Sequence, residues 1–238
     1  MHLPMQSLND QPQPVAFFDI DGTLFRSSLL IELVEQLVAD GIFPPEVKDM
    51  YQAEFVAWQN RTGSYETYIM AVVAAFRAHI KGVHYGDLAD VGRRVVSRHG
   101  QQVYRYTRDL IQELKEDGYF IVAISLSPKK ILDEFCAQYG FDKVYGRIYE
   151  IGPQDRFTGA MVEEHLIENK ANIVNRVQQH ERVDMERSLA VGDTDGDISL
   201  LEAVAEPICF NPNQGLYQHA QRRGWSVVVE RKDVIYKL

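Results

Sequence analysis

One junction constrains the fold of this chain more than any other stretch. An apolar run at positions 15–18, Val-Ala-Phe-Phe, leads directly into Asp-Ile-Asp-Gly-Thr at positions 19–23. Alternate side chains of a strand project from the same face, so Asp19 and Asp21 are expected on one side of the strand's end. Gly22 permits a sharp turn after them. Two neighbouring carboxylates repel each other unless a cation or a proton separates them, so this strand end predicts a site of charge chemistry.

The composition is that of an ordinary globular protein. The chain has 238 residues, of which 45% are hydrophobic and 25% are charged, enough for one or two domains. A formal net charge of −9 argues against a nucleic-acid partner, because a phosphate backbone would be repelled. No apolar run is long enough to span a membrane. Residues 1–14 are polar, proline-rich and without a signal-peptide pattern, so we expect a flexible N-terminal arm there.

Cysteine usage predicts the compartment. Cys136 and Cys209 are the two cysteines, and neither has a neighbouring histidine or a metal-ligand spacing. Both occupy apolar segments and are expected to be small core residues. A cytoplasmic location is therefore predicted.

The chain changes character twice. Residues 26–100 predict four helices, over about 28–41, 45–60, 65–81 and 87–99, and no strand. From residue 101 onward helices alternate with short apolar strands, which favours a mostly parallel sheet covered on both faces. The predicted fold is therefore α/β: a Rossmann-like core from residues 15–25 plus 101–238, with an all-helical cap domain inserted at 26–100. A hairpin over 144–151 and 157–162 is also expected.

Polar residues follow several predicted strands. Open parallel sheets bind ligands at the carboxyl ends of their strands, so Asp19, Asp21, Ser125 and Asp193 are expected at one site. Ser125 ends an apolar run, and its hydroxyl suits an anion such as phosphate. Ser127 precedes a proline and is expected to cap a helix beginning at Pro128.

Two further segments carry candidate residues. Lys170 opens a predicted helix, the unfavourable end of the helix dipole for a cation, so it is either a solvated lysine or a functional one. The segment 192–197 reads Gly-Asp-Thr-Asp-Gly-Asp after a strand. A helix–loop–helix calcium site would need glycine and glutamate at the sixth and twelfth positions from Asp193, which hold Ile198 and Val204. That alternative is excluded.

These motifs, in this order, resemble the four motifs of haloacid dehalogenase-like hydrolases. They are Asp-x-Asp-Gly-Thr, a serine after a strand, a helix-opening lysine and Gly-Asp-x-x-x-Asp. The helical insert after the first motif, with Ser-x-Ser-Pro at 125–128 and Asn-Pro-Asn at 211–213, is similar to the phosphoserine-phosphatase branch. The resemblance covers nearly the whole chain from residue 15.

The resemblance implies a Mg²⁺-dependent phosphatase that acts on a small phosphorylated metabolite through an aspartyl-phosphate. Asp19 matches the family nucleophile, and Asp21 matches the acid/base that protonates the leaving oxygen and then activates water. Ser125 and Lys170 would bind the phosphoryl oxygens.

The same resemblance implies a metal site. Asp19, the backbone carbonyl of Asp21, and Asp193 would be the Mg²⁺ ligands, and Asp197 would contribute directly or as a supporting residue. No signal for an oligomeric state was found.

Other functions stay open at this point. A phosphotransferase would use the same aspartyl-phosphate, and a non-catalytic protein that binds a phosphorylated ligand would share the fold. Dehalogenases of the superfamily need no proton for the leaving group, so the presence of Asp21 favours a phosphatase.

Substrate preference is predicted from one difference. Phosphoserine phosphatases carry a glutamate shortly after the first motif to meet the substrate's ammonium group, and the corresponding position here is Ser28. Glu32, one helical turn later, could substitute for it. Alternatively, Ser28 caps the first insert helix and Glu32 is solvated. We expect phosphoserine to be a poor substrate and another small phosphomonoester to be preferred.

Overall fold

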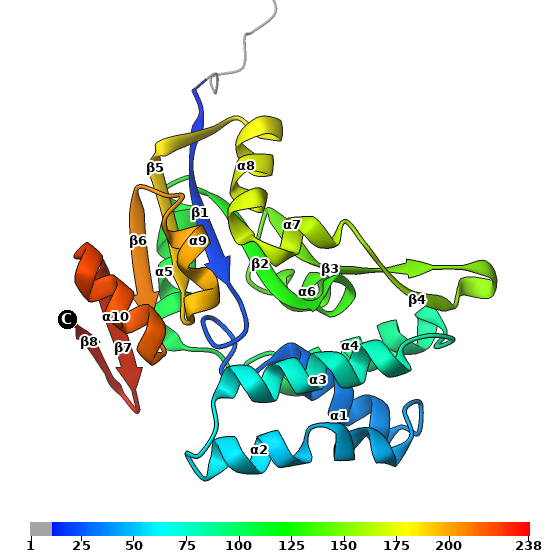
Figure 1. The fold of residues 1–238 in the computed structure, drawn as a ribbon. Coiled ribbons are helices and arrows are strands. Elements are labelled where there is room, and N and C mark those ends of the chain that lie inside the picture. The colour runs from blue at the N-terminus through cyan, green and yellow to red at the C-terminus, as the bar shows by residue number, and fades with distance from the viewer. Residues whose placement is uncertain (1–10) are drawn as a thin grey trace, which may run out of the picture.

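The computed structural model describes residues 11–238, and eight strands of this part form one sheet (Figure 1). Its order is β4-β3-β2-β1-β5-β6-β7-β8. The strands are β1 (Gln13–Asp19), β2 (Phe120–Pro128), β3 (Lys143–Ile151), β4 (Phe157–Val162), β5 (Val183–Gly192), β6 (Glu206–Phe210), β7 (Ser226–Arg231) and β8 (Val234–Lys237). The pairings from β3 through β7 are parallel, and the outer pairs β3–β4 and β7–β8 are antiparallel. The predicted α/β class with a mostly parallel sheet is confirmed.

Helices cover both faces of the sheet, as predicted. The helices that follow the insert are α5 (Arg105–Glu116), α6 (Lys129–Cys136), α7 (Glu164–Glu168), α8 (Lys170–His180), α9 (Ile198–Leu201) and α10 (Gln214–Arg223). Two 3₁₀ turns, η2 (Pro153–Asp155) and η3 (Asp195–Asp197), lie between them. Ala16 and Phe18 of β1 pack with α5 and α6, whereas Val15 and Phe17 pack with α8, α9 and α10. Both sides of β1 are buried, which is why this strand is continuously apolar.

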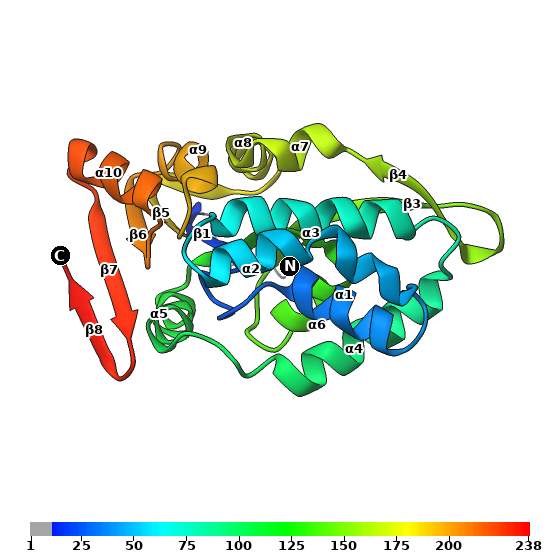
Figure 2. The same cartoon turned by 60° about the horizontal axis from the view of Figure 1, so that its bottom comes forward.

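The insert is helical, as predicted. Its elements are α1 (Leu29–Ala39), the 3₁₀ turn η1 (Pro45–Met50), α2 (Gln52–Gln59), α3 (Tyr65–His79) and α4 (Tyr85–His99). One continuous helix was predicted over about 45–60, but Tyr51 (φ −134°) interrupts it between η1 and α2. Figures 1 and 2 show α1–α4 as a layer beyond the carboxyl end of β1.

The chain enters and leaves the insert at adjacent points. Phe25 and Val103 form an antiparallel bridge. The Arg26 N–H donates to the Gln102 carbonyl at 2.9 Å, and the Tyr104 N–H donates to the Leu24 carbonyl at 2.9 Å. The two crossings, the segments by which the chain enters and leaves the insert, therefore run side by side and are joined by backbone hydrogen bonds.

The predicted element boundaries differ from the structure in several places. Residues 1–10 of the expected arm lie outside the described residues, and β1 begins at Gln13, ahead of the expected start at residue 15. Two short elements, α7 and β8, were not predicted. Cys136 and Cys209 are buried free thiols, as expected. None of the helices within residues 11–238 combines the length and apolarity needed to cross a membrane.

Candidate active site

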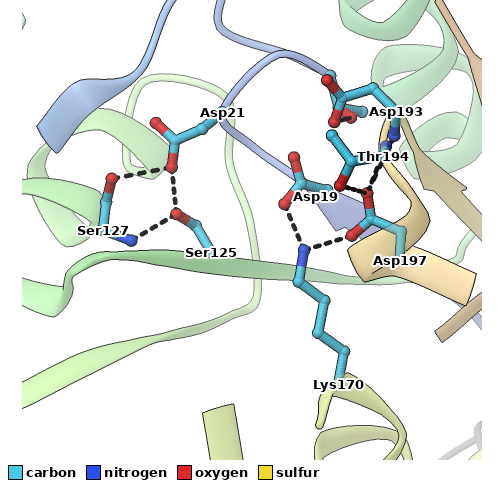
Figure 3. Close-up of polar contacts among 9 residues, drawn as sticks. Asp19, Asp21, Ser125, Ser127, Lys170, Asp193, Thr194 and Asp197 are labelled. Atoms are coloured by element: carbon cyan, nitrogen blue, oxygen red, sulfur yellow. Dashed lines mark hydrogen bonds and ion pairs between the residues drawn. The ribbon is translucent and has the colours of Figure 1, made fainter. Parts of the chain in front are cut away.

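Lys170 connects two of the predicted carboxylates. Its Nζ lies 2.5 Å from an oxygen of Asp19, at the end of β1, and 2.5 Å from one of Asp197 (Figure 3). Lys170 is only 8% exposed, so the solvated-surface alternative is wrong for this lysine. Burial alone would lower the lysine's pKa, but the two carboxylates together hold that pKa above its usual value. The site therefore contains a fixed positive charge.

Three carboxylates form a cluster that fits a divalent cation. Oxygen atoms of Asp19, Asp193 and Asp197 lie within 4.8 Å of one another. One buried oxygen of Asp19 has no hydrogen-bond partner. Burial raises the pKa of Asp19 to about 7, against the attraction of Lys170, and burial together with Asp19 raises the pKa of Asp193 well above its usual value. Hard oxygen ligands with uncompensated negative charge are what Mg²⁺ prefers, so the residues present fit that ion.

Gly22 is needed for the approach of Asp193. The backbone of Gly22 has φ +91°, and a Cβ added there would lie 2.2 Å from an oxygen of Asp193. The hydroxyl of Thr23 donates to the other oxygen of Asp193 at 3.2 Å. Thr23 belongs to the first motif, but its partner lies 170 residues further along the chain, so the sequence alone does not indicate this contact. The Gly-Thr pair after the two acids thus positions a carboxylate from a different strand end.

Asp197 also organises the loop that carries Asp193. One of its oxygens accepts hydrogen bonds from the N–H groups of Asp193 and Thr194, both at 3.0 Å. Its other oxygen is the partner of Lys170. From the next connection, the Asn213 N–H donates to the Asp193 carbonyl at 2.8 Å, and its side chain donates to Asp195 at 2.8 Å. Asn213, noted only as part of a motif, thus holds the same loop.

Asp21 lies in different surroundings from Asp19. One oxygen of Asp21 accepts the Leu29 N–H at 2.6 Å, at the start of α1, and the other accepts the hydroxyls of Ser125 and Ser127 (Figure 3). Burial raises the pKa of Asp21, and these donors partly offset that shift. The Asp21 carboxylate is outside the acidic cluster. The backbone carbonyl is therefore still the atom of Asp21 that we expect to bind the metal. A carboxyl group with a raised pKa is suited to holding a proton.

The predicted role of Ser127 as a helix cap is wrong. Strand β2 continues through Pro128, and α6 begins at Lys129 without a side-chain cap. The Ser127 hydroxyl instead donates to Asp21 at 2.8 Å, and its N–H donates to the Ser125 hydroxyl at 2.9 Å. The Ser-Pro pair has the local pattern of a helix start, but the pairing of Pro128 with Arg147 in β3 extends the strand.

A cavity of about 200 Å³ joins these groups. It is lined by both acids of the first motif, Lys170, Asp193 and Asp197, and by residues of α1, α3 and α7. Ser127 lines it, whereas Ser125 is fully buried and does not; a phosphate contact of Ser125 stays a prediction. Ser28 lies on the wall, and its hydroxyl accepts the Leu30 N–H at 3.2 Å, which confirms the predicted cap.

Glu32 does not replace the missing glutamate. It is not part of the cavity wall, and its carboxylate lies 3.8 Å from His99 of α4. The position in α1 that could have met an ammonium group therefore faces another insert helix.

Comparison with curated proteins finds relatives across most of the chain. An "inhibition of morphological differentiation protein" of Streptomyces azureus is 24% identical over 91% of this chain and 78% of its own length. A phosphoserine phosphatase of Mycobacterium tuberculosis is 25% identical, covering 95% and 76%. A histidinol-phosphatase of Neisseria meningitidis is 22% identical, covering 90% and 97%.

Solved structures and a family model agree with this result. A protein of unknown function from Bordetella pertussis superposes with a TM-score of 0.70 at 20% identity, over 91% of this chain and 98% of that one. An apo phosphoserine phosphatase superposes with a TM-score of 0.63 at 20% identity, over 93% and 95%. These likenesses show the fold. The model of the haloacid dehalogenase-like hydrolases matches residues 16–202, and the chain therefore belongs to that family.

Proposed function

We propose that this protein is a Mg²⁺-dependent phosphatase that hydrolyses a small phosphomonoester through an aspartyl-phosphate formed on Asp19. One observation carries the proposal: Asp19 lines the cavity with one oxygen paired to Lys170 and the other buried without a partner. Such an oxygen is available to an attacked phosphorus or to a cation. The relatives named as phosphoserine phosphatase and histidinol-phosphatase support a phosphomonoester as substrate.

The first step transfers the phosphoryl group to the protein. The Asp19 carboxylate attacks phosphorus and forms a new P–O bond, while the bond from phosphorus to the leaving alcohol breaks. The electron pair stays on the leaving oxygen, and Asp21 gives it a proton. The raised pKa of Asp21 increases the fraction that carries this proton near neutral pH. Lys170 offsets the charge of the phosphoryl oxygens.

The second step releases phosphate. Asp21, now ionised, takes a proton from a water molecule as that water attacks the phosphorus of the aspartyl-phosphate. The P–O bond to Asp19 breaks, inorganic phosphate leaves, and Asp21 is protonated again for the next cycle. The hydroxyls of Ser125 and Ser127 hold the Asp21 carboxylate in place when it has no proton.

Asp19, Asp193 and the backbone carbonyl of Asp21 would hold Mg²⁺, with Asp197 fixing Lys170 and the Asp193 loop. The ion would supply charge neutralisation between an anionic nucleophile and an anionic ester.

We further propose that residues 26–100 act as a cap over this centre, with 15–25 and 101–238 as the catalytic core. Cap helices α1 and α3 contribute to the cavity wall, which gives the insert a direct influence on the leaving group.

The test is hydrolysis of 4-nitrophenyl phosphate with Mg²⁺. Asp19→Asn should reduce turnover by at least about 10⁴-fold, because the nucleophile is lost. Chelation should abolish turnover, and added Mg²⁺ should restore it. Asp184→Asn is the matched control, since Asp184 pairs with Arg187 and does not line the cavity. Full activity of Asp19→Asn, or of the chelated protein, would refute the mechanism.

A further inference from the structure

The cavity wall beyond the reacting groups is largely apolar. Six apolar side chains from α1, α3, β2 and α7 contribute to it: Leu30, Ile69, Met70, Val73, Leu126 and Ile167. Met70 is 49% exposed and Leu126 is 38% exposed, which leaves apolar surface for a bound molecule to cover. The volume of about 200 Å³ is below the range usual for drug-sized ligands, so the leaving group is small.

The charged side chains on this wall that have no partner are all acidic. Lys170 is the only cation among the described residues that line the cavity, and Asp19 and Asp197 already neutralise it. Glu66 of α3 and Glu168 of α7 line the same cavity and are exposed. Within residues 11–238, no ion pair or hydrogen bond engages either glutamate side chain. The wall thus offers two free carboxylates and no free cation.

These charges discriminate between leaving groups. A carboxylate on the leaving alcohol would meet no cation and would be repelled by Glu66 and Glu168. An ammonium group would be attracted by both. Because the two glutamates are exposed, each attraction is modest and is weakened by salt.

We infer, on the basis of the proposed function, that the substrate is the phosphate ester of a small amino alcohol with an apolar body and no carboxylate. The phosphate lies at Asp19, the apolar body covers Leu126 and the α3 side chains, and the ammonium group lies near Glu66 and Glu168. Glu66 and Glu168 are then specificity residues that take no part in the chemistry. Phosphoserine is disfavoured by its carboxylate, independently of Ser28.

The test uses three esters with the same phenol leaving group, so that bond cleavage itself is held constant. The first is 4-ethylphenyl phosphate, which has no charge on its leaving group. The second, tyramine O-phosphate, carries an ammonium group, and the third, O-phosphotyrosine, carries both an ammonium group and a carboxylate. With Mg²⁺ present, kcat/KM for tyramine phosphate should exceed that for 4-ethylphenyl phosphate by about fivefold, the effect of two exposed ion pairs. The kcat/KM for tyramine phosphate should also exceed the kcat/KM for phosphotyrosine by about tenfold or more, because the carboxylate of phosphotyrosine is repelled.

Variants assign the preference to the two glutamates. In the double variant Glu66→Gln with Glu168→Gln, the ratio of tyramine phosphate to 4-ethylphenyl phosphate should fall from about five to about one. Glu164→Gln is the matched control on α7, because Glu164 pairs with Arg77 and does not line this cavity. That control should keep the wild-type ratio.

Two outcomes separate this inference from the proposed function. If the esters are hydrolysed at equal kcat/KM, if phosphotyrosine leads, or if the double variant keeps the ratio, the inference is refuted and the phosphatase stands. If none of the three is hydrolysed with Mg²⁺, and 4-nitrophenyl phosphate is not either, the proposed function fails and the inference fails with it.

Discussion

Two carboxylates separated by one residue occupy opposite kinds of surroundings. Asp19 belongs to the sheet and faces a buried ammonium group and two further acids. Asp21 faces only neutral donors, two hydroxyls and the first N–H of an insert helix. In the Asp19 region one buried cation partly offsets three acids, whereas in the Asp21 region hydrogen bonds hold a single acid at the junction with the insert.

This difference supports the different roles that we propose for the two acids. Burial raises the pKa of both acids, and at Asp19 the cation of Lys170 opposes that shift and favours the ionised form that a nucleophile must have. Asp21 has only neutral hydrogen-bond donors as partners, and a carboxyl group in such surroundings, with its pKa raised by burial, is suited to exchanging a proton. The two environments are built from different strand ends, so each can be tested by separate substitutions.

The largest effect is expected at Lys170, on the Asp19 side. Lys170→Gln leaves Asp19 and Asp197 buried without their cation, which should lower the free energy of unfolding of the metal-free protein by about 3 kcal/mol. Turnover should fall about 10³-fold because phosphoryl charge is no longer offset. Chemical denaturation and steady-state kinetics measure both.

The matched control for this prediction is Lys130→Gln. Lys130 pairs with Glu134 on the surface of α6, where such a pair contributes less than about 1 kcal/mol. Equal losses of stability in the two variants would show that the charges around Asp19 are not interdependent.

The next largest effect is expected at Asp21. Asp21→Asn keeps an acceptor for the Leu29 N–H but cannot donate a proton as an acid. Alkyl phosphates, whose leaving oxygen needs that proton, should lose about 10²–10³-fold in kcat/KM. Aryl phosphates should lose about tenfold or less, since a phenolate leaves more easily. Equal losses for both ester types would mean that Asp21 acts structurally.

Removing one acid of the cluster should stabilise the metal-free protein. The pKa of Asp19 is raised from 3.8 to about 7 on folding, so the folded state binds protons more tightly, and stability present below pH 3.8 is lost as the pH rises through about 7. Asp193→Asn removes a repelling charge and should add about 1–2 kcal/mol at pH 8 while reducing the pH dependence. Thermal unfolding without metal at pH 5 and pH 8 measures this.

Mg²⁺ should reverse the order of stability. The ion should raise the Tm of the wild type and have little effect on Asp193→Asn. Asp184→Asn serves as the control, because Asp184 is paired with Arg187 outside the site and its pKa is lowered by that contact. A rise in metal-free stability for Asp184→Asn as well would point to net charge as the cause.

The smallest effect is expected at Ser127. Ser127→Ala removes one of three donors to Asp21 and should lower kcat/KM about fivefold. It should leave the start of α6 unaffected, since Ser127 does not cap that helix. Ser64→Ala, which removes a true cap of α3, provides the comparison and should cost about 1 kcal/mol of stability. A stability loss without a kinetic loss in Ser127→Ala would contradict this assignment.

The sequence predicted the charged residues of the site better than the residues that surround them. Asp19, Lys170 and Asp193 come together because strand and helix ends of a parallel sheet meet at one edge, and that rule can be applied to sequence. The role of Ser127 could not be found this way, because a local Ser-Pro pattern cannot show that a neighbouring strand extends β2 through it.

Other residues escaped sequence reasoning for similar reasons. Glu66 and Glu168 stand alone in sequence as ordinary surface acids, and only the packing of α3 and α7 around one cavity gives them a shared position. The short elements α7 and β8 carry too few residues for a periodic pattern. Thr23 was visible in its motif, but its partner, Asp193, is far along the chain.

The paired crossings at Phe25 and Val103 bear on how such a protein can diversify. Because the chain departs from the sheet and returns to it at adjacent residues, the helices between these points can be lengthened, shortened or exchanged without rethreading the core. Mutations can therefore accumulate in the insert while the strand-end acids stay fixed. Changes in the sequence of the insert therefore need not affect the acids at the strand ends.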